Sequence, residues 1–132
     1  MKLKRAKRYI DCFQPICNAL GVSLRVISLN LPRKKDPEYY SKSCYRAGKT
    51  PAIFIIISRI ENTARLVECF VHELIHHIQY IRGLFPKAFK KNHGSSIRIE
   101  KHARKVTDKI LWNMFGFHGS RLTKDIIKEY SK

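Results

Sequence analysis

The sequence predicts an α+β fold: an N-terminal helix, a small three-stranded sheet, a helix that carries the motif H-E-x-x-H, and a second long helix after it. Three observations support this prediction. Apolar residues recur at helical spacing in three long stretches. Short segments rich in β-branched residues lie between the first two stretches. The chain has 132 residues and no visible repeat or linker, so we expect residues 1–132 to form a single domain.

The first predicted element is an amphipathic helix over residues 2–20. Gly21 follows directly and is expected to end it. Pro15 lies inside this stretch, and proline cannot donate a backbone hydrogen bond, so the helix is expected to kink there or to split in two. Its apolar positions are Tyr9, Ile10, Phe13, Ile16, Cys17 and Leu20.

Three short strands are predicted next, at residues 24–31, 44–47 and 53–58. The first alternates between apolar and polar residues, whereas the third is a continuous apolar run and reads as a buried strand. Gly48-Lys49-Thr50-Pro51 joins the second to the third, which predicts a hairpin.

Two long helices complete the prediction. The first begins near Glu61-Asn62-Thr63 and runs to about Arg82, where Gly83 ends it. A basic loop from Phe85 to Gly94 follows. The second helix is expected to be capped by Ser95 or Ser96 and to run to about Phe115, and a short amphipathic tail follows at residues 123–130. The apolar stripe of the second helix is Ile97, Ala103, Val106, Ile110, Leu111 and Met114.

The most informative residues are His72, Glu73 and His76, which form the H-E-x-x-H motif. Residues four apart on a helix share a face, so both imidazoles can bind one metal ion. Glu73 can reach a water on that ion and act as general base. The neighbouring residues are apolar, and unpaired polar groups are costly in such surroundings, which favours a metal site. The alternative is a set of core histidines bonded to backbone carbonyls.

A catalytic zinc ion usually takes three protein ligands, so a third is expected from elsewhere in the chain. His77 follows His76 and points away from it, and His102 shares its helix face with basic residues. His118 follows the second helix among glycines and stays possible. The candidates are Glu100, His93, His102, His77 and His118.

Glu100 and His93 are the two main candidates for this third position. Glu100 falls on the apolar stripe, where a carboxylate needs a partner, and the small Ala103 one turn on lets two helices approach closely. His93 precedes Gly94 in the loop before the same helix. The two positions are about 10 Å apart along a helix axis, so only one of them should reach the ion.

Two peptidase families resemble this chain. The order of helix, sheet, H-E-x-x-H helix and Glu-x-x-Ala at Glu100 to Ala103 is similar to the minigluzincins, which implies a zincin-like fold and a zinc site of His72, His76 and Glu100. Gln79 also occurs in families with the pattern HExxHxxQ. His93-Gly94 resembles the third-ligand segment of the SprT-like proteases, which cut proteins crosslinked to DNA. The chain does not resemble metzincins.

These features predict a zinc metallopeptidase with one Zn²⁺ per chain, Glu73 as general base, and protein or peptide substrates. Extended substrate is expected to add to the free edge of the strand at residues 53–58. The alternatives are a SprT-like DNA-associated protease and a non-catalytic nucleic-acid-binding protein with a structural metal. A latent enzyme covered by residues 123–132 is a weaker alternative.

The composition predicts attraction to polyanions, with nucleic acid first and an anionic membrane surface second; the alternative is a charged surface that only keeps the protein in solution. The 27 basic and 10 acidic residues give a net charge of +17 at pH 7, which predicts non-specific attraction to nucleic acid. The basic clusters lie at residues 2–8, 33–35 and 87–91. No apolar run is long enough for a membrane span and no signal peptide is visible, so an intracellular protein, cytoplasmic or associated with nucleic acid, is expected.

The cysteines predict no zinc ribbon, because none of the four forms a C-x-x-C pair. In a mesophilic cytosol they would be reduced, whereas a hyperthermophilic source would make disulfides plausible. Cys69 lies one turn before His72 and is expected to pack beneath the metal site. The four residues are Cys12, Cys17, Cys44 and Cys69.

Overall fold

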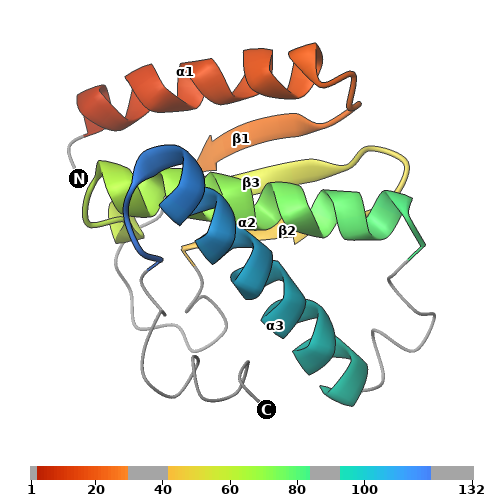
Figure 1. Cartoon of the computed structure of the whole chain (residues 1–132). Helices are drawn as coiled ribbons and strands as arrows, with labels where there is room; N and C mark the ends of the chain where they lie inside the picture. Colours follow the sequence, from red (N-terminus) through yellow and green to blue (C-terminus); the bar gives the residue numbers. More distant parts are fainter. Residues whose placement is uncertain (1–2, 30–41, 84–92, 120–132) are drawn as a thin grey trace. The chain divides into compact units, whose positions relative to one another are not determined.

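The computed structural model describes residues 3–29, 42–83 and 93–119, and over these residues the architecture is α+β as predicted (Figure 1). The chain divides into two compact units, Met1–Leu74 and Ile75–Lys132, and the boundary falls inside one helix. The expectation of a single domain stays a prediction. In chain order the elements are α1 (Leu3–Ala19), β1 (Arg25–Leu29), β2 (Ser43–Arg46), β3 (Ala52–Ile56), the 3₁₀ turn η2 (Ile57–Arg59), α2 (Thr63–Ile81), α3 (His93–Ile110) and the π-helical turn η4 (Leu111–Phe115).

Helix α1 is continuous through Pro15, so the proline does not split it. Its buried face is narrower than the apolar pattern predicted, and comprises Ala6, Ile10, Phe13 and Cys17. Tyr9, Ile16 and Leu20 were expected on that face but are exposed. The difference arises because six apolar positions cover more of the helix circumference than the sheet beside it can bury.

The sheet has the strand order β1-β3-β2 and is mixed. Strand β3 pairs with β2 in antiparallel fashion, which confirms the hairpin, and with β1 in parallel. The expectation that residues 53–58 offer a free edge is therefore wrong, since β3 is the central strand and Ser58 lies in η2. Within the described ranges the outer strands are β1 and β2.

Strand β3 is buried along its length except at Phe54. Ile53 and Ile55 are fully buried. Phe54 points to the opposite face, where it is half-buried, and the guanidinium carbon of Arg46 lies 5.2 Å from its ring centroid. Ser43 pairs with Ile55 and therefore shares the buried face.

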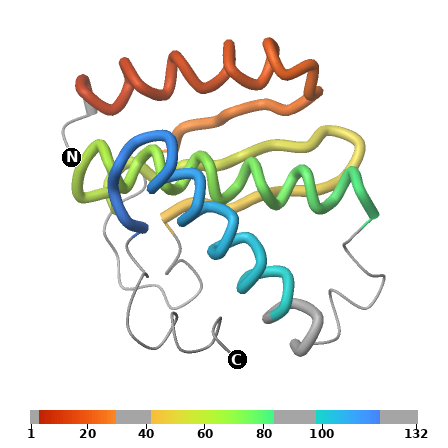
Figure 2. Tube along the Cα trace, viewed as in Figure 1, coloured from red at the N-terminus to blue at the C-terminus, as the bar shows by residue number. Residues whose placement is uncertain are grey.

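Helix α2 begins and ends as the sequence predicts. The Asn62 side-chain oxygen accepts a hydrogen bond from the backbone N–H of Arg65 at 3.0 Å, which caps the first turn. Gly83 has a φ of 70° and follows the last turn, where glycine adopts the left-handed conformation most readily. The ring of Phe70 stacks on that of Phe13 at a centroid distance of 4.1 Å, which joins the first half of α2 to α1. Figure 2 traces α2 as one unbroken helix.

Helix α3 starts at His93, so the capping role expected of Ser95 or Ser96 is wrong and His93 lies in the helix. Ala103 and Leu111 are buried as predicted, whereas Met114 is 74% exposed. Met114 leaves the predicted stripe because the last turn, η4, is a π-helix, whose wider spacing rotates the following side chains.

The helices within the described ranges are too short or too polar to cross a bilayer. The predicted loop at residues 85–92, the tail at 123–130 and the basic clusters at 33–35 and 87–91 lie outside the described part of the chain.

Candidate metal centre

Helix α2 brings His72, Glu73 and His76 together. One potential ligand atom from each lies within 4.8 Å of the corresponding atoms of the other two. This grouping follows from the helix alone, since positions i and i+4 are one turn apart. Over the described residues it is the one group of three histidine, cysteine or acidic side chains arranged to hold an ion.

The surroundings of this group are apolar, although its members are polar. Glu73 is 4% exposed and His76 is 5% exposed, and the buried residues Phe70, Val71 and Ile75 flank them on the helix. Placing a carboxylate and an imidazole in such surroundings is costly unless each has a strong partner. Both groups therefore need polar partners, and a cation is one of the partners that would stabilise them.

Glu73 receives a hydrogen bond from the edge strand. The Ser43 hydroxyl donates to Oε2 of Glu73 over 3.3 Å. Ser43 is placed for this contact because its side chain lies on the buried face of the sheet, opposite Ile55. The contact holds one carboxylate oxygen of Glu73 and so restricts the orientation of the whole group.

Cys69 lies one turn before the motif and is buried. Burial raises the pKa of its thiol to about 11; the negative charges of Glu68 and Glu73 add to the rise, and a hydrogen bond with Ser43 opposes it. Cys69 is therefore a protonated thiol at neutral pH, in keeping with the expected packing role. All four cysteines are free thiols.

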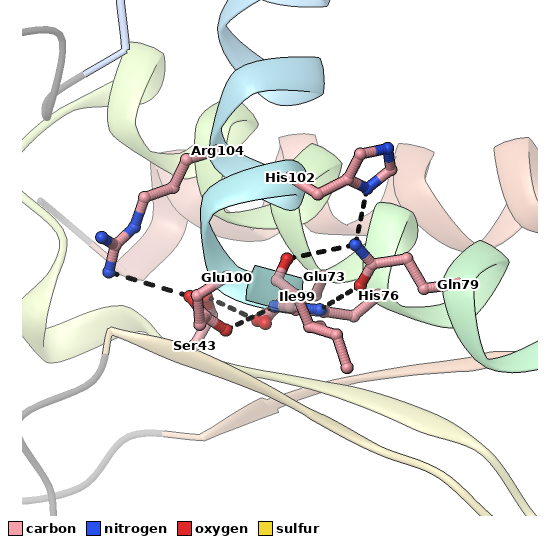
Figure 3. A network of polar contacts seen from close by, with 8 residues as sticks. All are labelled: Ser43, Glu73, His76, Gln79, Ile99, Glu100, His102 and Arg104. Atoms are coloured by element: carbon pink, nitrogen blue, oxygen red, sulfur yellow. Dashed lines mark hydrogen bonds and ion pairs between the residues drawn. The ribbon is translucent and has the colours of Figure 1, made fainter. Parts of the chain in front are cut away.

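Glu100 contacts His76. Its Oε1 lies 2.7 Å from Nε2 of His76, and its Oε2 lies 3.8 Å from Nη2 of Arg104 (Figure 3). Helix α3 presents Glu100 here because Ile99 and Ala103 on either side of it are buried. Two ligands of one tetrahedral zinc ion, each bound at about 2.0–2.1 Å, lie roughly 3.3 Å apart, so this carboxylate and imidazole could share an ion after a small adjustment.

Gln79 makes a network around the other nitrogen of His76. Its Oε1 lies 2.8 Å from Nδ1 of His76, and its Nε2 donates to the backbone oxygen of Ile99 at 3.1 Å and lies 2.8 Å from Nδ1 of His102 (Figure 3). His76 thus has Glu100 at one nitrogen and Gln79 at the other. Such outer contacts fix the ring of a metal-binding histidine.

The other candidate ligands do not join the group in the described part of the chain. His77 is buried, and burial lowers the pKa of its imidazole. His102 is exposed on α3 and bonds Gln79. The ring of His118 stacks on Trp112 at 4.5 Å. The side chain of His93 lies outside the described residues, so its role stays a prediction.

The sequence prediction missed the contacts of two residues. Ser43 gave no signal, because its partner Glu73 lies on a different element. Gln79 enters the prediction only through the pattern HExxHxxQ, although its position in the helix also indicates a contact with His76. It follows His76 by three residues and so shares its helix face, where a buried amide needs partners.

A scan against protein-family models and searches of curated proteins and of solved structures found no match for this chain. The resemblance to zincin peptidases therefore rests on the residues themselves.

Proposed function

We propose that this protein is a zinc-dependent peptidase. The observation that carries the proposal is the grouping of His72, Glu73 and His76 on one helix, where His72 is half-buried and the other two are buried. The contact between Glu100 and His76 adds a third donor of the right chemistry. Two imidazoles and a carboxylate are a recognised ligand set for catalytic zinc, so the residues present fit the ion.

In this proposal His72, His76 and Glu100 hold the ion and Glu73 does not bind it. When bound, zinc would lower the pKa of a water molecule and polarise the substrate carbonyl. Glu73 would accept the proton of the attacking water and then deliver it to the departing amine. Ser43 would keep the Glu73 carboxylate oriented for this transfer through its hydrogen bond to Oε2.

The sheet suggests how an extended peptide would bind. Strand β2 pairs with β3 on one side, and within the described residues no strand pairs with its other side. A substrate could add to that edge through backbone hydrogen bonds. Because β2 also carries Ser43, a peptide bound there would lie beside Glu73.

The decisive test replaces Glu73. Glu73→Gln should retain one zinc per chain while losing hydrolysis of a quenched peptide library, because the amide cannot accept a proton from water. Glu68→Gln is the matched control, since Glu68 lies on the same helix and pairs with Arg65 instead. His72→Ala and His76→Ala should each abolish stoichiometric zinc.

Two results would contradict the proposal. If wild-type protein binds zinc but hydrolyses none of the library peptides, the structural-metal alternative is favoured. If the double histidine variant keeps full zinc, the whole site assignment fails.

One observation favours nucleic acid as a second partner. Lys4, Arg5, Lys7 and Arg8 are all exposed in the first turns of α1, so four cations are presented on one short helical segment. Such a cluster suits the phosphate backbone of DNA or RNA without reading its sequence. This partner is compatible with peptidase activity and would suit the SprT-like alternative, which is based on the motif with His93 as third ligand.

A further inference from the structure

Gln79 is a buried amide whose hydrogen-bonding groups are all used. It is 2% exposed. Its two N–H groups are directed at Ile99 and His102, and its oxygen faces His76. A glutamine amide has two donors on nitrogen and an acceptor oxygen, so this arrangement leaves neither end without a partner.

The direction of the amide follows from Ile99. A backbone carbonyl oxygen can only accept a hydrogen bond, so the nitrogen end of the Gln79 amide must face it. The oxygen end then faces Nδ1 of His76 and also requires a donor. Nδ1 of His76 must therefore carry a hydrogen, and in the neutral ring Nε2 keeps its lone pair. The hydrogen between Nε2 and Oε1 of Glu100, which lie 2.7 Å apart, then belongs to the Glu100 carboxyl group until an ion replaces it.

We infer that Gln79 is a positioning residue that holds His76 in the Nδ1–H tautomer and aims its Nε2 at the metal. The importance of this tautomer for zinc binding rests on the proposed function. The tautomer itself is inferred from the hydrogen bonds of Gln79 alone. The same amide bonds Ile99, which directly precedes Glu100. One side chain thereby orients one ligand and anchors the helix turn that carries another.

The physical consequence concerns both ligands. A histidine that binds a metal through Nε2 becomes more acidic at Nδ1–H, and an acceptor at that position stabilises the bound form. Without Gln79, the neutral His76 ring would be free to place its proton on Nε2, next to Glu100, and would then have to exchange that proton before binding an ion.

The test determines which ring nitrogen of His76 carries the hydrogen in metal-free protein. The measurement is a long-range ¹H–¹⁵N NMR correlation of the histidine rings, at a pH where the rings are neutral. Wild-type protein should show His76 with its proton on Nδ1. Gln79→Leu should move it to Nε2 and weaken zinc binding by roughly 10- to 100-fold in a chelator competition. Gln79→Glu keeps the oxygen acceptor at Nδ1 but loses the donor to Ile99, so it should retain the wild-type tautomer of His76.

His102→Leu is the matched control. It removes one acceptor of the Gln79 amide but leaves the contacts with Ile99 and His76, so the His76 tautomer should not change. The inference is overturned if wild-type His76 carries its proton on Nε2, or if Gln79→Leu keeps the Nδ1–H form with unchanged zinc affinity. The tautomer measurement does not depend on peptidase activity. A protein that lacks this activity should still show the Nδ1–H form of His76, so failure of the proposed function can be told apart from failure of this inference.

Discussion

Glu100 is the residue on which the assignment of the zinc site depends most. Glu100→Ala should weaken zinc binding by more than the roughly 10- to 100-fold expected for loss of an outer contact, because it removes a ligand atom. His93→Ala is the comparison and should leave the affinity within a few-fold. Competition with a chromogenic chelator measures both. If His93→Ala instead had the larger effect on zinc affinity, His93 and not Glu100 would be the third ligand, and the SprT-like alternative would be favoured.

Cys69 provides a prediction about reactivity. With a pKa of about 11, about one thiol in a thousand is ionised at pH 8, and the thiolate is the reactive form. Cys69 should therefore resist iodoacetamide in the folded protein, whereas the exposed Cys12 should react. Peptide mass spectrometry gives the extent of labelling at each site. Equal labelling of the two thiols under native conditions would show that Cys69 is accessible.

The motif and the hydrogen bonds around it show what can be predicted at the scale of the residue. His72, Glu73 and His76 were predicted because their grouping depends only on helical periodicity. The contact of Ser43 with Glu73 was not, because it depends on how β2 pairs with β3 and no local pattern encodes that pairing.

At the scale of the element, a stacked aromatic pair joins α1 to α2. Phe13 and Phe70 stack nearly parallel and are both buried. Phe13→Ala should lower the free energy of unfolding by about 3–5 kcal/mol, since it removes a large buried side chain and leaves a cavity.

The control for this change is on the same helix. Tyr9 is 39% exposed, so Tyr9→Ala should change stability much less. Denaturant titration followed by circular dichroism measures both variants. Similar losses for the two would mean that the contact between Phe13 and Phe70 contributes little.

The elements were largely predictable, and the errors have a common cause. The three helices and the hairpin follow from local periodicity and turn residues. The prediction that β3 is an edge strand failed because strand order depends on which distant segments pair. The predicted start of α3 and the predicted burial of Met114 were also wrong. Both depend on packing at the ends of the helix, where α3 begins at His93 and the π-turn η4 ends it.

At the scale of the whole molecule, the net charge of +17 predicts a strong salt effect on nucleic-acid binding. Affinity for a labelled DNA duplex should fall steeply between low and physiological salt, with little dependence on sequence. Fluorescence anisotropy measures it. Absence of binding at low salt would remove nucleic acid as a partner.

A pair of variants tests whether α1 is the contact surface. Replacing Lys4, Arg5, Lys7 and Arg8 by Gln should lower the salt slope by up to about four, if each contacts a phosphate. The control replaces four exposed basic residues elsewhere, which are Arg82, Arg98, Lys105 and Lys109. Equal effects of the two sets would indicate attraction by net charge alone.

The central position of β3 also has a consequence for the order of folding. Ile53 pairs with Tyr45 across a short turn but with Val26 across a much longer stretch of chain. Because closing a longer loop costs more entropy, the hairpin should form before the parallel pair. Tyr45→Ala should then slow folding, whereas Val26→Ala should mainly speed unfolding, so that the φ-value of Tyr45 exceeds that of Val26. The edge that carries Ser43 would thus be in place before β1 completes the sheet.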